Sequence, residues 1–202
     1  MNTLFTIGHS TRAIEEFIGL LRENGVTAVA DVRSSPYSRH SPQFNADALQ
    51  RSLRDHQVHY VSLGEELGAR RDEPECYVED VAAYPLIAKT AAFARGMERL
   101  RTGLKSQQIA LLCAERDPLT CHRMILVCRH LREECEIVHI IGAGENEGQA
   151  SAEARLLKVV GLPDRDLFRD REDLIDEAYS IQGDQIAFRR ETLVAASPSG
   201  AN

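Results

Sequence analysis

Five short runs of apolar, β-prone residues alternate with stretches of helical periodicity in the first 144 residues. The apolar runs cover 4–7, 26–32, 58–63, 108–113 and 136–141. Between the first two, Ile14, Phe17, Ile18 and Leu21 recur at helical spacing. This alternation predicts an α/β fold: a mainly parallel five-stranded sheet with helices on both faces, in a Rossmann-like three-layer arrangement.

The remaining segments are assigned by the same criteria. We expect a surface excursion or lid over 64–79, a helix from about 78 to 104 with a break at Pro85, and another helix over 119–132. Beyond a turn-rich link at 144–148, short helices are predicted at 152–160 and 170–179, and a strand or core-packing segment at 185–188. The predicted organisation is an α/β core domain (1–144), a helical extension packed on it (145–194) and a disordered tail (195–202).

Composition limits the partners. The 202 residues carry a net charge of −7, which argues against a protein that coats nucleic acid, because such a protein needs a basic surface. No apolar run approaches the ~18 residues of a membrane span, and the N-terminal pattern is not that of a signal peptide. The five cysteines, an odd number at irregular spacing, are expected to be reduced thiols in the cytoplasm. The sequence specifies neither a cofactor nor an oligomeric state.

Polar side chains gather where the predicted strands end. In an open parallel sheet, ligands bind beyond the carboxyl ends of the strands, so these residues are candidates for a common site. The first strand is followed by His9 and Ser10, the second by Asp31, Arg33, Ser34 and Ser35, and the fourth by Cys113, Glu115, Cys121, His122 and Arg123.

Cationic residues in this set suggest an anion site. Guanidinium groups of Arg33, Arg39 and Arg123 could clamp a phosphate or carboxylate. The N-terminus of a helix opening at 119–121, after the Asp117-Pro118 turn, would add backbone donors. The alternative is a structural network in which Arg33 pairs with Asp31 and Arg123 with Glu115.

Titratable residues in the set suggest proton transfer. His9 and Glu115 could act as a general acid/base pair, with Asp31 orienting the partner; alternatively, His9 is simply bonded to a neighbouring carbonyl. Cys121, beside His122, could be a thiolate nucleophile, or a packed core thiol.

No metal site is assigned from the sequence. The spacing of His9, Cys113, Cys121 and His122 matches no standard zinc module. Adjacent side chains such as Cys121 and His122 would also point apart on a helix. A zinc-dependent enzyme remains an alternative that metal analysis would test.

Several of these motifs resemble the domain-of-unknown-function 488 family. They are Thr6-Ile7-Gly8-His9-Ser10; Asp31-Val32-Arg33-Ser34-x-Pro36-x-Ser38-Arg39 with Phe44; Leu112-Cys113-Ala114-Glu115-x-x-Pro118-x-x-Cys121-His122-Arg123; His139-Ile140; and Glu177-Ala178-Tyr179-x-x-Gln182. The resemblance covers nearly the whole chain and implies a compact α/β fold.

The leading functional hypothesis is an enzyme acting on a small anionic ligand, a nucleotide or another phosphorylated metabolite. Hydrolysis or group transfer is expected rather than redox chemistry, because no Gly-x-Gly-x-x-Gly fingerprint follows a strand. The catalytic candidates are His9, Asp31, Glu115 and Cys121, and the ligand-binding candidates are Ser10, Arg33, Ser34, Arg39, His122 and Arg123. The alternative is a non-catalytic module for nucleic acid or a modified nucleotide, based on the 33–40 loop with its stacking-capable Tyr37.

Overall fold

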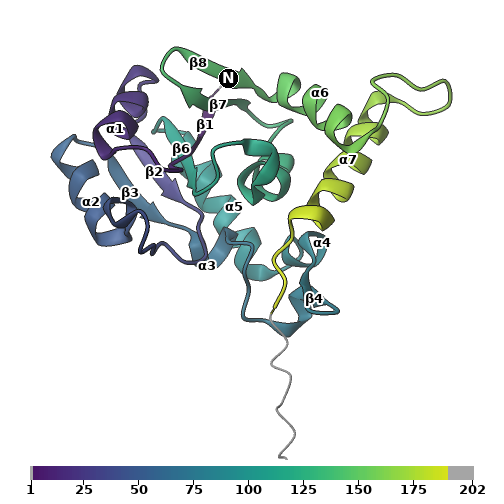
Figure 1. Ribbon diagram of the computed structural model, residues 1–202, viewed down its shortest axis with the longest axis horizontal. Helices are drawn as coiled ribbons and strands as arrows, with labels where there is room; N and C mark the ends of the chain where they lie inside the picture. The colour runs from purple at the N-terminus through teal and green to yellow at the C-terminus, as the bar shows by residue number, and fades with distance from the viewer. Residues whose placement is uncertain (1, 191–202) are drawn as a thin grey trace, which may run out of the picture.

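A six-stranded sheet organises the computed structural model, which describes residues 2–190 (Figure 1). Its strands, in spatial order, are β3 (His59–Ser62), β2 (Ala28–Asp31), β6 (Ile109–Cys113), β1 (Thr3–Gly8), β7 (Glu136–Gly142) and β8 (Glu145–Gly148). The first five are parallel, and β8 runs antiparallel to β7. The fold is therefore α/β with a mainly parallel sheet, as predicted.

The number of strands and their order differ from the prediction. The sixth strand, β8, occupies the predicted link, and it was missed because this mostly exposed edge strand of polar residues and glycine shows no apolar alternation. In chain order, the strands of this sheet lie third, second, fourth, first, fifth, sixth, whereas a dinucleotide-binding sheet places the first beside the second. A Rossmann-like arrangement is therefore not confirmed.

Helices cover both faces of the sheet, and each face has its own buried cluster. On one face, α1 (Ile14–Glu23) and α2 (Ala46–Asp55) pack Phe17 and Leu49 against Ile7 and Leu112. Helix α5 (Ala91–Leu104), the segment after β6 and the C-terminal helices cover the other face. The sheet edge that carries the strand ends lies between these layers.

Residues 77–82 form a hairpin instead of the predicted start of a helix. Strands β4 (Tyr77–Val78) and β5 (Val81–Ala82) are joined by Glu79 and Asp80, whose φ angles of 48° and 63° are left-handed, as a tight two-residue hairpin turn requires. Short turns flank the hairpin: α3 (Gly64–Leu67) and η2 (Pro74–Cys76) before it, and α4 (Tyr84–Ile87) after it.

The segment after β6 is not the regular helix that we predicted over 119–132. It consists of the 3₁₀ turn η3 (Pro118–Thr120), the π-helical turn η4 (Arg123–Val127) and the 3₁₀ turn η5 (Cys128–His130). Cys121 lies between them with an extended backbone, φ −137° and ψ 136°. No regular helix therefore begins at 119–121, so the prediction of a helix N-terminus there, which was to supply backbone donors to an anion, is wrong.

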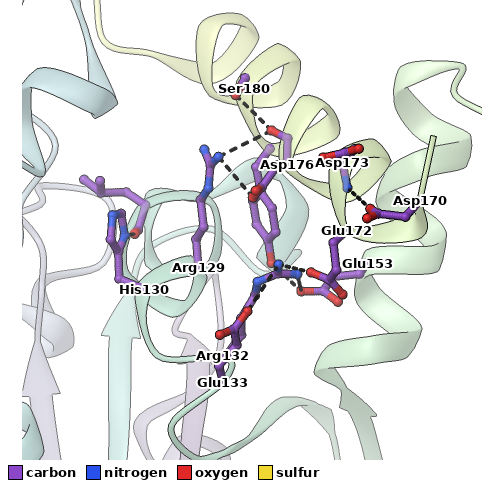
Figure 2. Close-up of polar contacts among 12 residues, drawn as sticks. Arg129, His130, Arg132, Glu133, Glu153, Asp170, Glu172, Asp173, Asp176 and Ser180 are labelled. Atoms are coloured by element: carbon purple, nitrogen blue, oxygen red, sulfur yellow. Dashed lines mark hydrogen bonds and ion pairs between the residues drawn. The ribbon is translucent and has the colours of Figure 1, made fainter.

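Helices α6 (Gln149–Val160) and α7 (Arg171–Ile186) dock on this segment (Figure 2). Arg132 forms ion pairs with Glu153 of α6 and Glu172 of α7, and Arg129 donates to Asp176. Beneath these charges, Leu156 and Leu174 are fully buried in the same cluster as α5. The C-terminal helices therefore share a core with the sheet.

After α7 the chain returns to the hairpin. The Ala82 amide donates to the Phe188 carbonyl (2.8 Å), and Arg189 forms an isolated antiparallel β-bridge with Val81. We predicted a strand or a core-packing segment at 185–188. Residues 185 and 186 are the end of α7, and residues 187 and 188 belong to the segment that returns to β5. The predicted tail, 195–202, lies outside the described residues. Within 2–190, no helix combines the length and the hydropathy that crossing a membrane requires.

Candidate functional site

The carboxyl ends of β2, β6 and β1 lie side by side, and a cavity of about 690 Å³ opens next to them. Five of the ten site residues predicted from the sequence line it: Arg33, Ser34, Glu115, Cys121 and His122. Cys113, which also follows the fourth predicted strand, lines it as well. Tyr37 of the 33–40 loop also lines the cavity. The structure therefore brings the residues after β2 and after β6 together on one wall.

Arg33 is held from behind by Asp31 and His9. Its Nε and Nη2 donate to the two carboxylate oxygens of Asp31 at 2.8 and 2.6 Å, and Nη2 also donates to the carbonyl of Phe44. Nη1 lies 3.2 Å from His9 Nε2. These contacts engage four of the five N–H donors. Burial alone would lower the pKa of Arg33, but the hydrogen bonds to Asp31 and the charge of Asp31 raise it. The Arg33 guanidinium therefore stays positively charged.

Asp31 is itself buried and does not line the cavity. Besides Arg33, it accepts a hydrogen bond from the Tyr60 hydroxyl at 2.9 Å. Burial and the neighbouring Asp31 charge raise the pKa of Tyr60, so the hydroxyl stays protonated as a donor. The ion pair between Arg33 and Asp31, one part of the structural network considered above, is therefore present.

His9 is part of the support for Arg33. Its ring stacks on Phe44 at a centroid distance of 4.5 Å, and Nδ1 lies 2.9 Å from the Ser10 carbonyl, to which it donates. Nε2 then accepts from Arg33, which requires a neutral ring. Burial, followed by the charge of Arg33, lowers the pKa of His9. With both nitrogens engaged and the ring outside the cavity lining, His9 positions Arg33.

Cys113, Cys121 and His122 meet at the cavity wall. The His122 Nδ1 lies 3.6 Å from Cys113 Sγ and 4.0 Å from Cys121 Sγ. The expectation that Cys121 and His122 point apart on a helix is wrong, because Cys121 has an extended backbone. His122 Nε2 donates to the Val32 carbonyl at 3.0 Å, so Nδ1 is the nitrogen that faces the two sulfurs.

The surroundings of Cys113 and Cys121 shift the pKa values of the two thiols in opposite directions. Burial acts to raise the pKa of Cys121, but the hydrogen bond with Cys113 and the charges of Arg123 and His122 bring it well below the ordinary value. The same hydrogen bond, together with burial, raises the pKa of Cys113. Glu115 Oε2 lies 3.1 Å from Cys113 Sγ, and loss of solvent followed by the Cys121 charge raises the Glu115 pKa.

Arg123 does not line the cavity. It is fully buried, and its Nη1 and Nη2 donate to the carbonyls of Glu115 and Arg116 at 2.6 and 2.9 Å, while Nε donates to the Thr6 hydroxyl. The expected partner, the Glu115 carboxylate, is replaced by its backbone. Arg123 thus anchors the loop that carries Glu115.

Arg39 and Ser10 are also absent from the lining. Arg39 is exposed on the 33–40 loop, and the Ser10 amide donates to the Ala114 carbonyl at 2.8 Å. Of the three arginines in the predicted clamp, only Arg33 reaches the cavity.

Two other arginines line the cavity that the sequence did not single out. Arg70 follows α3; its amide donates to Ser34 Oγ at 2.9 Å, and its guanidinium lies 4.7 Å from the Phe188 ring centre. Arg189 and Phe188 come from the crossing after α7. No sequence pattern marks these residues, because their position depends on how α7 returns the chain to β5.

The Cys113, Cys121 and His122 cluster also has the composition of a metal site. One potential ligand atom from each lies within 4.8 Å of the others. Among residues 2–190, no second group of three His, Cys, Asp or Glu side chains meets the same spacing.

Comparison with known proteins identifies a family and nothing closer. The family profile described as "Domain of unknown function DUF488" matches residues 13–129, which span α1 to η5 and include Arg33, Glu115 and the Cys–Cys–His cluster. Neither the curated proteins nor the solved structures contain a match to the chain. Because the matched region covers more than half of the sequence, the chain belongs to the DUF488 family, as its motifs suggested.

Proposed function

We propose that the protein is an enzyme that binds a small anionic ligand, a nucleotide or another phosphorylated metabolite, in this cavity and acts on it by hydrolysis or group transfer. The observation that carries the proposal is the division of the cavity wall: Arg33, Arg70 and Arg189 supply cations, and Glu115, Cys121 and His122 supply titratable groups. Guanidinium groups suit phosphate oxygens, and the adjacent groups suit proton transfer or nucleophilic chemistry.

The proposal distributes the predicted roles according to position. In this proposal Glu115 and Cys121 contact the substrate directly, since both line the cavity. His9 and Asp31 act through Arg33 as positioning residues. A substrate phosphate would meet the remaining Nη1 donor of Arg33, whose direction is set by Asp31 and His9.

The test is calorimetric titration with inorganic pyrophosphate and a panel of nucleoside monophosphates. Replacing Arg70 by Gln removes one cation at an exposed position that carries no core packing. We expect saturable binding by the wild type and about tenfold weaker binding by Arg70→Gln, in line with the loss of one charge-assisted hydrogen bond. The matched control is Arg54→Gln, an exposed arginine on α2 outside the cavity. Equal affinities of Arg70→Gln and wild type, or no binding across the panel, would refute the proposal.

A second candidate is a non-catalytic module that recognises nucleic acid or a modified nucleotide. It is favoured by Tyr37, which lines the cavity with its side chain 66% exposed, as a base-stacking ring requires. Binding of a short oligonucleotide should then fall steeply with salt and fall again in Tyr37→Ala. Salt-insensitive binding would argue against this candidate.

We also propose that the protein works in the cytoplasm. The support is chemical: Cys76, Cys113, Cys121, Cys128 and Cys135 are all free thiols, and a reducing compartment preserves them. Fractionation of cells followed by immunodetection tests this location, and recovery in an oxidising compartment would contradict it.

A further inference from the structure

We propose that Cys113, Cys121 and His122 form a binding site for one zinc ion in the wall of the cavity. Two thiolates and an imidazole are the ligands that Zn²⁺ takes in three-ligand catalytic sites, where the fourth position stays open. Hard cations such as Mg²⁺ or Ca²⁺ prefer oxygen ligands, so this donor set does not suit them.

The spacing of the three donors fits tetrahedral zinc. With Zn–S near 2.3 Å and Zn–N near 2.0 Å, ligand atoms in such a site lie about 3.5–3.8 Å apart. The separations from His122 Nδ1 are 3.6 Å to Cys113 and 4.0 Å to Cys121, and all three atoms lie within 4.8 Å of one another. The separation between His122 Nδ1 and Cys113 Sγ already has this value, and closing the other separations by at most about 1 Å would complete the geometry.

Contacts behind the donors have the form expected around a bound metal. A ligating histidine donates its second N–H to a carbonyl or carboxylate, which fixes the tautomer. The Val32 carbonyl takes this position at 3.0 Å from His122 Nε2 and leaves Nδ1 directed at the sulfurs. The Arg123 amide lies 3.4 Å from Cys121 Sγ and can donate to a thiolate there.

Charge also favours an ion at this place. Zn²⁺ binds cysteine as the thiolate, so it would neutralise the two negative charges of Cys113 and Cys121, and the protons that this pair carries beforehand would be released to solvent. Since all three ligands line the cavity, the open fourth position would face the bound anion, with Glu115 beside Cys113. The ion site stands on this geometry alone; a part for the ion in turnover rests on the proposed function.

The experiment is metal binding by the full chain, reduced and freed of metal with a chelator. Zn²⁺ is titrated against a chromophoric competitor, and Co²⁺ is added separately to look for thiolate-to-cobalt charge-transfer absorption. We expect one Zn²⁺ per chain and a tetrahedral Co²⁺ spectrum. Cys113→Ser, Cys121→Ser and His122→Gln should each weaken Zn²⁺ binding by more than about 100-fold, because loss of even an outer contact costs 10- to 100-fold.

Cys135→Ser is the matched control. Cys135 is a buried thiol that donates to the Leu131 carbonyl and takes no part in the cluster, so this variant should bind Zn²⁺ like the wild type. Circular dichroism of each variant separates loss of ligand from loss of fold. Sub-stoichiometric zinc in the reduced wild type, or equal affinity in the three ligand variants, would overturn the proposal. Arg70→Gln should bind Zn²⁺ normally, so failure of the ion site and failure of the anion site are distinguishable.

Discussion

Gly8 and Arg123 hold the loop after β6 from two directions. Arg123 donates to the carbonyls of Glu115 and Arg116, and the end of β1 presses on the same peptide, so that a Cβ built at Gly8 would lie 1.8 Å from the Glu115 oxygen. Glycine is required at this position because of close approach between two backbones. The placement of Glu115 in the cavity depends on both contacts.

Gly8→Ala should therefore destabilise the protein. The clash involves backbone atoms that cannot rotate away, and we expect a loss of at least about 2 kcal/mol in the free energy of unfolding, as for other overpacked sites. Urea unfolding measures the change. Gly19→Ala in α1 is the control, since nothing lies within 4 Å of its added methyl, and it should be neutral or stabilise the helix by up to about 1 kcal/mol. Unchanged stability of Gly8→Ala would contradict the contact.

Single residues also show where the sequence stops being informative. The position of Arg33 next to Asp31 follows from their order after a strand. For Arg123 the sequence shows only a cation near a strand end, which fits either an anion ligand or a structural anchor. The deciding fact is that two backbone carbonyls lie within reach of its guanidinium, and backbone acceptors leave no trace in side-chain identity.

Strands β1 and β7 and helix α6 are joined by a chain of buried polar groups. Arg123 Nε donates to Thr6, the Thr6 hydroxyl lies 2.8 Å from His139 Nδ1, and His139 Nε2 lies 3.0 Å from Gln149 Oε1. The ring is fully buried and satisfied as a neutral group. Burial, followed by the charge of Arg123, lowers the pKa of His139 to about 3.

The buried, neutral His139 predicts that the protein loses stability in acid. Above pH 6.5 His139 is neutral in both the native and unfolded states and has little effect. Between pH 6.5 and 3 only the unfolded chain binds the proton, so the free energy of unfolding falls as the pH falls. Between pH 7 and pH 5, this difference in protonation of His139 lowers the free energy of unfolding by about 2 kcal/mol. Urea unfolding at both pH values should show a decrease that is smaller by this amount in His139→Gln. Parallel pH dependence of the two proteins would disprove the assignment.

The segment from η3 to η5 shows why one element was predicted with the wrong geometry. Met124, Ile125, Cys128 and Leu131 recur at helical spacing, and this suggested a regular helix. In the structure every residue of η4 is buried, so no polar stripe records the number of residues per turn. An apolar pattern on all sides fits an α-helix and a π-helical turn equally, and the extended backbone of Cys121, which joins the cluster, could not be inferred.

At the scale of the whole molecule, the cavity is assembled from segments at opposite ends of the chain. Arg33 and Ser34 come from the first forty residues, and Phe188 and Arg189 from the last part that the structure describes. The parallel strands and the gathering of their ends were predictable because each signal is local. The crossing of 187–190 over β5 was not, because it depends on the docking of α7.

Phe188 should affect binding as well as stability, because its ring contacts both Arg70 and the core. Its ring supports the Arg70 guanidinium from 4.7 Å, and an exposed cation–π contact contributes about 0.5–1 kcal/mol. If the proposed function holds, Phe188→Ala should raise the Kd of the bound anion about two- to fivefold. Because the half-buried ring also packs against the core, the melting temperature should fall too, and the Kd is measured well below it. Phe168→Ala, at a side chain 94% exposed and outside the cavity, is the control. If Phe188→Ala and Phe168→Ala gave the same Kd, the Phe188 ring would not help to hold the Arg70 guanidinium for binding.

The crossing of the C-terminal segment over β5 has a consequence for biosynthesis. During translation, residues 187–190 emerge from the ribosome after the strands of the sheet, α5 and the Cys–Cys–His cluster. The wall that carries Phe188 and Arg189 can close only after those residues emerge. A chain that lacks residues 187–190, whether nascent or clipped by a protease, would thus carry Cys113 and Cys121 without a complete binding cavity.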